Sequence, residues 1–258
     1  MKAINTLRMG GVDVLPLVEG GKGISVSNGA SAGAWAAAGG AGTVSIVNAD
    51  SYDENGQPVP QIYKGRTRRE RHEELVQYAI AGGIAQTRIA HGVSGGRGRI
   101  HANILWEMGS AERVITGVLE GTQGLIHGLT CGAGMPYKLA DIAMRFGVHY
   151  YPIVSSARAF NALWKRSYNK AADLLGGVVY EDPWRAGGHN GLSNTEDPLN
   201  PEDPYPVCWP CARPCAVLAC MKRPLSWLVA CGGLRNGRTG SIILNWGRLF
   251  SSSAPVRC

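Results

Sequence analysis

His189 is the residue of this chain best suited to acid–base chemistry. It follows Gly187 and Gly188 after a predicted strand, where backbone without side chains can approach a planar ligand closely and an imidazole can face it. An ordinary histidine pKa of about 6.5 suits proton abstraction at neutral pH. Spacing alone leaves a second interpretation open, and favours it: a histidine of a surface loop.

Two other features could serve a bound cofactor. The loop Gly20-Gly21-Lys22-Gly23 could direct main-chain N–H groups at a ligand, although it fits no phosphate-binding fingerprint and is, by itself, a tight turn. Asn103 is a polar residue inside an apolar strand. Its amide either binds a ligand at the end of that strand or is satisfied by neighbouring backbone, and the sequence does not choose between the two.

The charge and cysteine patterns divide the chain near residue 206. The seven basic residues after Asp203 account for the whole net charge of +7, so the body of the chain is neutral and we expect no nucleic-acid partner. Six of the seven cysteines lie in the same tail, but it contains no histidine and no second Cys-x-x-Cys pair. We therefore expect no metal site.

Strands alternate with helices along residues 1–206, which predicts an α/β fold with a parallel sheet. The predicted strands are 14–18, 43–47, 100–105, 125–130, 150–154 and 177–180. The predicted helices are 31–38, one capped by Thr67, 111–119, 138–146 and 157–169. Glycines gather after the first, fourth and sixth strands. In β/α barrels the active site is built at these C-terminal ends of the strands. Without a long apolar run or a secretory signal, the expectation is a cytoplasmic protein with no membrane contact.

The Ala-Gly-Gly-His-Asn-Gly run at 186–191 resembles the Ala-Gly-Gly-His-x-Gly signature of nitronate monooxygenases, also called 2-nitropropane dioxygenases. Other segments agree in order. Residues 15–23 resemble the family's first strand, and 30–42 its Ala-rich helix. Asn103 matches a strand-three asparagine, and Gly134-Met135-Pro136 a Gly-x-Pro turn. The resemblance covers residues 14 to about 206.

This resemblance implies a (β/α)₈ TIM barrel with noncovalent FMN at its C-terminal mouth. It implies an oxidoreductase that uses O₂ to convert an alkyl nitronate into a carbonyl compound and nitrite. His189 would be the base, and Gly187 and Gly188 would leave room for flavin and substrate. The other implied cofactor-binding residues are Gly20, Gly21, Lys22, Gly23, Asn103 and Gly134.

One departure and two alternatives go with this assignment. The family often has Glu before the signature, where this chain has Arg185, which bears on substrate preference. An NAD(P)H-dependent flavin reductase acting on a quinone or enoyl substrate has the same fold. A noncatalytic remnant is the third interpretation.

Residues 207–258 match neither of the two strands that would complete the barrel. Back-translation with each codon started one base earlier permits peptides similar to the family's seventh and eighth strands. We therefore interpret the chain as a barrel domain over 1–206, incomplete at about six β/α units, and a tail over 207–258 that is out of frame after a one-base shift near Pro206–Val207. Six strands alone cannot close an eight-strand barrel.

Overall fold

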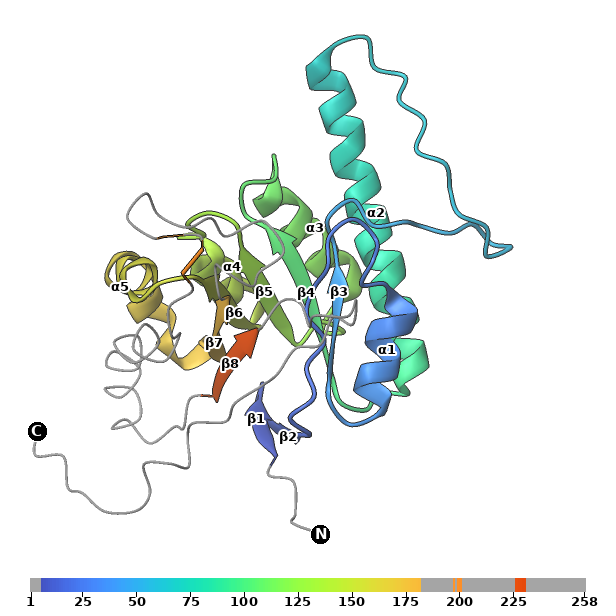
Figure 1. Cartoon of the computed structure of the whole chain (residues 1–258). Helices are drawn as coiled ribbons and strands as arrows, with labels where there is room; N and C mark the ends of the chain where they lie inside the picture. The colour runs from blue at the N-terminus through green and yellow to red at the C-terminus, as the bar shows by residue number, and fades with distance from the viewer. Residues whose placement is uncertain (1–5, 182–196, 198, 201–225, 231–258) are drawn as a thin grey trace, which may run out of the picture.

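The structure is a computed structural model that describes residues 6–181, 197, 199–200 and 226–230. Its centre is a six-stranded sheet in which every neighbouring pair of strands is parallel and the strand order follows the chain (Figure 1). The strands are β3 (Ala41–Ser45), β4 (Arg99–Leu105), β5 (Gly128–Gly132), β6 (His149–Val154), β7 (Gly177–Glu181) and β8 (Ser226–Ala230). Consecutive parallel strands joined by helices are the arrangement of a β/α barrel, so the predicted fold class is confirmed.

Helices connect the strands from β3 to β7 and cover one face of the sheet. They are α1 (Gly29–Ala37), α2 (Arg68–Ser94), α3 (Ala111–Thr122), α4 (Leu139–Phe146), α5 (Ala157–Arg166) and the 3₁₀ helix η1 (Tyr168–Leu174). Beneath them lies the main apolar core, which includes Val44, Ala102, Leu129 and Tyr150 from four adjacent strands. The predicted helix over 157–169 is divided, because α5 ends at Arg166 and the 3₁₀ turn begins at Tyr168.

The first predicted strand, 14–18, is wrong as a continuous strand. Only Val18 forms a bridge to β3, at Ala41, while β2 (Val12–Val14) pairs antiparallel with β1 (Leu7–Met9). Pro16 lacks the backbone N–H that a strand ladder needs. It therefore separates β2, which ends before it, from the bridge at Val18, which follows it. The backbone still follows β3, because Ala41 N donates to Leu17 O at 2.8 Å.

The β1–β2 hairpin lies at the N-terminal end of the sheet (Figure 1). Its buried residues Leu7, Met9 and Val14 pack with Tyr151 of β6 and Val179 of β7, on the sheet face opposite the helices. This second, smaller cluster closes that end of the fold.

β8 lies in the tail, where the sequence analysis predicted no strand. Its backbone pairs with β7 over five positions, from Gly177–Ser226 to Glu181–Ala230. The strand Ser226–Ala230 therefore extends the sheet in the direction of a seventh barrel strand. The boundary near 206 lies outside the described residues.

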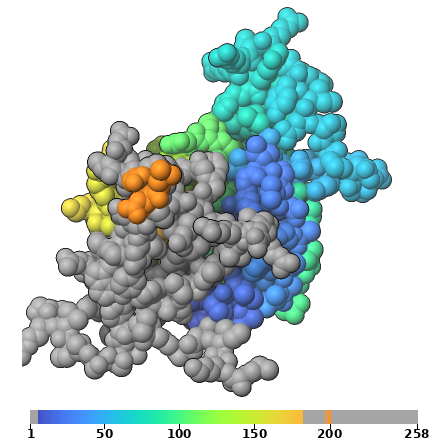
Figure 2. Space-filling model, in the orientation of Figure 1, coloured from blue at the N-terminus to red at the C-terminus, as the bar shows by residue number. Residues whose placement is uncertain are grey.

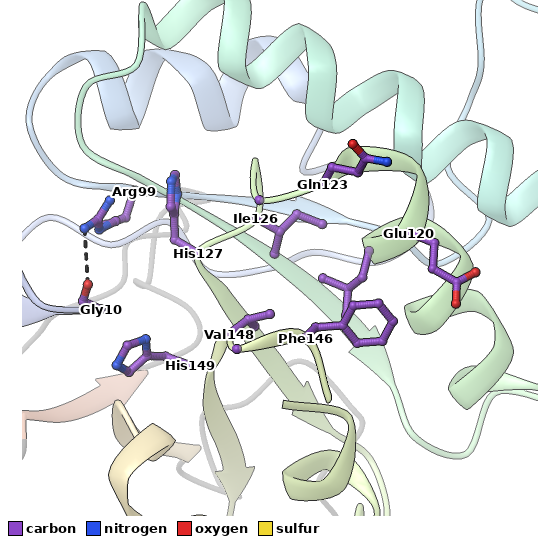
Figure 3. Close-up of a pocket in the computed structure, with 12 residues that line it drawn as sticks. Gly10, Arg99, Glu120, Gln123, Ile126, His127, Phe146, Val148 and His149 are labelled. Carbon is purple, nitrogen blue, oxygen red and sulfur yellow. Dashed lines mark hydrogen bonds between the residues drawn. The ribbon is translucent and has the colours of Figure 1, made fainter. Parts of the chain in front are cut away.

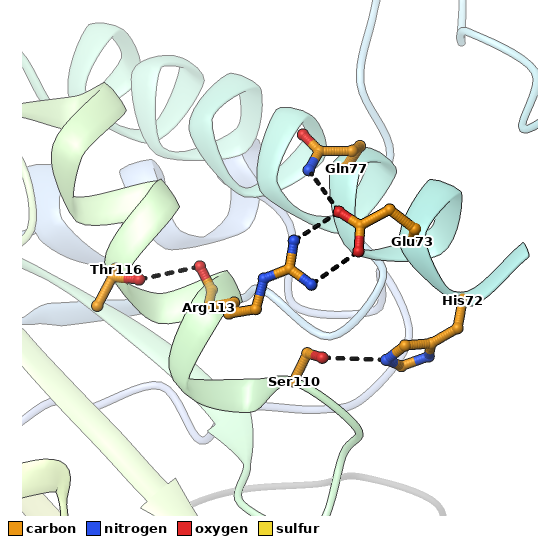
Figure 4. A network of polar contacts seen from close by, with 6 residues as sticks. All are labelled: His72, Glu73, Gln77, Ser110, Arg113 and Thr116. Carbon is orange, nitrogen blue, oxygen red and sulfur yellow. Dashed lines mark hydrogen bonds and ion pairs between the residues drawn. The ribbon is translucent and has the colours of Figure 1, made fainter. Parts of the chain in front are cut away.

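α2 is 27 residues long, and its first turns stand out from the body together with residues 50–67 (Figures 1 and 2). Thr67 caps it as predicted, in a capping box with Glu70. Further along, the Arg113 guanidinium of α3 binds both carboxylate oxygens of Glu73 (Figure 4). Among the described helices, α2 included, none combines the length and apolar character needed to cross a bilayer.

Candidate functional site

The C-terminal ends of β3, β4 and β5 carry a row of polar residues. Asn103 is aligned with Ser45 on one side and with Thr130 on the other. Residues paired in this way point to the same face of a sheet. The residues between them along the strands, Val44 and Ala102, belong to the core under the helices. Ser45, Asn103 and Thr130 therefore face the interior side of the barrel sheet, close to its C-terminal edge.

The glycine loop lies directly against this row. A Cβ atom added to Gly21 would fall 2.3 Å from Cγ and 2.4 Å from Cβ of Asn103. Real side chains do not approach this closely, so only glycine allows the loop to rest on Asn103. The structure thus brings together Gly21 and Asn103, two of the residues for which the resemblance implies cofactor binding.

The polar groups at this point are not all used within the described protein. Asn103 is 4% exposed, and no described residue forms a hydrogen bond with its side-chain amide. The buried Ser45 hydroxyl beside it also has no partner among these residues. Buried polar atoms are rarely left without a hydrogen bond, so the Ser45 hydroxyl, next to the Asn103 amide, indicates a place where a polar ligand completes the site.

Ser27 holds the glycine loop in shape. Its hydroxyl donates to Gly20 O at 3.1 Å and accepts from the Lys22 N–H at 3.0 Å. Its carbonyl accepts from Ser45 N at 2.8 Å, which ties the loop to β3. The Lys22 N–H is therefore committed inside the loop. Gly23 at the exposed tip has no atom within 4 Å of its Cβ position.

Glu19 anchors the start of the same loop and was not identified from the sequence. Its buried carboxylate accepts hydrogen bonds from the Ser31 hydroxyl and from Thr43 N, so it joins α1 and β3. Burial raises the pKa of this carboxyl, against the opposing effect of those hydrogen bonds. A lone carboxylate at the end of an apolar run was the signal that could have indicated it.

Gly134 lies at the same edge, in the turn after β5. Its φ of +117° requires glycine, and its Cβ position is 2.9 Å from Cγ of Glu107. The backbone of Glu107 donates to Ala133 O at 3.0 Å, which fixes this turn beside the end of β4. Gly134 is thus placed next to Glu107, whereas Gly21 is the residue in contact with Asn103.

A second polar layer lies deeper in the interior. The rings of His101 and Tyr151 are stacked with centroids 4.6 Å apart, across Gly128 of the strand between them. A Cβ at Gly128 would be 2.6 Å from His101 Nε2, so glycine makes this stacking possible. Burial lowers the pKa of His101 to about 3, which keeps the ring neutral at ordinary pH. Polar residues at every second position, Thr43 with Ser45 and His101 with Asn103, were the signal for this face.

Gly187, Gly188 and His189 lie outside the described residues. Among the described residues, no group of three or more His, Cys, Asp or Glu side chains is placed to hold a metal ion. Cys131 is a buried free cysteine, and burial raises the pKa of its thiol far above the ordinary value.

Comparison with known proteins gives a likeness of fold. No protein-family model matches the chain, and no curated protein matches it in sequence. Among solved structures, nitroalkane oxidase from Streptomyces ansochromogenes is similar with a TM-score of 0.50 and 12% identity, over 84% of this chain and 58% of that one. FabK from Thermotoga maritima is similar with a TM-score of 0.49 and 17% identity, over 87% of this chain and 52% of that one. The chain thus spans between half and three fifths of these proteins.

Proposed function

We propose that the chain is the cofactor-binding part of an FMN-dependent oxidoreductase that oxidises alkyl nitronates with O₂. The observation that carries the proposal is the contact between Gly21 and Asn103, where a buried amide without a described partner faces the C-terminal edge of a parallel sheet. The signature at 186–191 supports the same chemistry. The fold likeness to a nitroalkane oxidase agrees with it but adds only the architecture.

The residues at this edge fit a flavin. The glycine loop 20–23 leaves backbone uncovered beside Asn103, and the Asn103 amide and Ser45 hydroxyl can bind the polar edge of a planar ring system. Gly134 would border the ring from the turn after β5. When bound, FMN would supply the two-electron redox chemistry, while the protein supplies binding, orientation and the base.

His189 is assigned the proton transfer. Its neutral imidazole would take the proton from the carbon next to the nitro group, which leaves a nitronate anion and an imidazolium. A nitronate supplied directly needs no such step. In atom balance, two nitronate anions and one O₂ give two carbonyl compounds and two nitrite ions.

Flavin binding is the first test. The full chain, purified with FMN supplied, should show a bound flavin spectrum, and Asn103→Leu should weaken FMN binding about tenfold, or about 1.4 kcal/mol. Asn169→Leu, at an exposed asparagine of η1, is the matched control and should bind as the wild type does. A folded chain that binds no FMN overturns the proposal.

Activity is the second test. Nitronate should drive O₂ consumption and nitrite release without a nicotinamide. His189→Ala should lower turnover of the neutral nitroalkane far more than turnover of the nitronate. Flavin reduction that requires NAD(P)H would instead support a reductase.

A further inference from the structure

A pocket of about 570 Å³ opens at the end of the sheet opposite the candidate site (Figure 3). It lies at the N-terminal ends of β4, β5 and β6, where Arg99, His127 and His149 are placed, and the turn of the β1–β2 hairpin contributes Gly10. Every residue that lines it belongs to the described part of the chain. The proposed flavin site leaves this pocket unused.

One end of the pocket is basic and organised around Gly10. The position of a Cβ at Gly10 is 3.6 Å from Arg99 Nε and 3.6 Å from His149 Nδ1, so these two side chains meet at one point. Arg99 also donates to Met9 O at 3.3 Å and to Gly10 O at 3.2 Å, which fixes the guanidinium beside the pocket (Figure 3).

The charge at this end is not neutralised within the described residues. No carboxylate in this part of the structure forms an ion pair with Arg99. The carboxylate that lines the pocket, Glu120, already pairs with Arg145 at 2.9 Å. A half-buried guanidinium without a counter-ion favours an anion beside it.

His127 adds a hydrogen-bond donor to the basic end. Its Nδ1 accepts the backbone N–H of Ile100 at 3.0 Å, so the neutral ring carries its proton on Nε2. Burial, together with the charge of Arg99, lowers the pKa of His127 to about 4. An anion near this ring would raise the pKa of His127.

The other end of the pocket, away from Arg99, carries apolar side chains together with the polar side chains of Glu120 and Gln123. Leu119, Ile126 and Val148 are buried there, and Phe146 lies with them, away from Arg99 in Figure 3. The Arg145 guanidinium already lies 5.0 Å from the centre of the Phe146 ring, and a bare inorganic ion would make no apolar contact with Ile126 or Val148. A ligand with an apolar group attached to its anionic group would cover both ends.

We propose that this pocket binds a small organic anion, with its carboxylate or phosphate at Arg99 and His127 and its apolar group against Phe146. The site is separate from the catalytic mouth and acts independently of the proposed flavin chemistry. Small-molecule sites commonly combine an apolar wall with a few placed polar groups in this way.

Phenyl phosphate is the probe, titrated into the full chain by calorimetry and by NMR of the backbone amides. The amides of Gly10, Gly124 and Gly147 should shift, those of Gly21 and Gly23 should not, and added FMN should not compete. The pKa of His127 should rise from about 4 on binding. Inorganic phosphate and benzyl alcohol should each bind at least tenfold more weakly.

Two substitutions separate what the basic end and the apolar side chains of the pocket each contribute to binding. Arg99→Gln should weaken phenyl phosphate at least tenfold, whereas Arg97→Gln, which removes the same charge at an exposed position nearby, should not. Phe146→Ala should weaken phenyl phosphate but leave inorganic phosphate unchanged. Equal effects at Arg97 and Arg99, or amide shifts at Gly21 in place of Gly10, would overturn the proposal. If Arg99→Gln does not fold, the backbone amide shifts of the wild type and the affinity of Phe146→Ala for phenyl phosphate still test the proposal.

Discussion

At the scale of single residues, Gly21 offers a sharp test of the candidate site because a near neighbour serves as its control. Gly21→Ala forces a methyl group to within 2.3 Å of Asn103, whereas Gly23→Ala meets no atom within 4 Å. We expect Gly21→Ala to weaken FMN binding about tenfold and Gly23→Ala to change it less than twofold. Fluorescence titration with FMN measures both.

The double variant Gly21→Ala/Asn103→Gly removes the clash but also the amide. It should recover the thermal stability lost in Gly21→Ala without recovering FMN affinity. Equal recovery of both quantities would mean that Asn103 only supports the loop.

His101 makes stability depend on pH. Its pKa is about 3 in the folded chain and about 6.5 when unfolded, so between these values only the unfolded state binds the proton. Stability is therefore complete above pH 6.5 and falls as the pH drops, by about 1.4 kcal/mol per pH unit for this group. The raised pKa of Glu19 acts in the opposite direction.

The measurement is urea unfolding at pH 6.5 and pH 4.5. His101→Phe keeps a ring against Tyr151 but removes the titrating group, so it should reduce the stability difference between the two pH values by about 2–3 kcal/mol. An unchanged difference would show that His101 takes up a proton in the folded state.

Residue identity indicated the site's chemistry but not its contacts. The polar character of Asn103 and the glycines at 20–23 is visible in the sequence. Their meeting depends on how residues 17–19 run beside β3 and on the alignment of Ser45 with Asn103, which a single sequence does not encode locally. Glu19 and the pairing of His101 with Tyr151 were missed for the same reason, since each contact joins distant segments.

At the scale of elements, Gln86 joins α2 to the start of α1. Its side chain is 3% exposed, accepts from Gly29 N at 2.7 Å and donates to Asp50 O at 2.8 Å. Gln86→Leu leaves both backbone groups unsatisfied and should destabilise the fold by about 2–4 kcal/mol. Gln77→Leu, on an exposed turn of the same helix, should cost less than about 0.5 kcal/mol. Urea unfolding followed by circular dichroism compares the two.

The elements themselves were largely predictable where local patterns were strong. The alternation of β-branched residues indicated β3, and Thr67 indicated the start of α2. The exceptions have physical causes. Pro16 interrupts the first strand, and β1–β2 depends on apolar partners in β6 and β7. Ser226–Ala230 becomes a strand through its pairing with β7, which composition does not predict.

At the scale of the whole molecule, the reading frame of the gene after codon 206 determines whether the last two strands of the barrel are encoded. Insertion of one base near codon 206 would restore the frame that we infer. The resemblance to nitronate monooxygenases implies that the seventh and eighth strands carry glycine-rich turns that hold the FMN phosphate. The restored protein should therefore bind FMN more tightly than the 258-residue chain. Parallel flavin titrations test this, and equal affinity of the two proteins would contradict the frameshift hypothesis.

The β1–β2 hairpin also governs the order in which this protein can be assembled. Leu7 and Met9 leave the ribosome before their partners Tyr151 and Val179, which are made only after most of the described chain. Contacts between such distant segments form late and slowly. During synthesis Leu7 and Met9 therefore remain uncovered, accessible to chaperones and to neighbouring nascent chains, until β6 and β7 have been made.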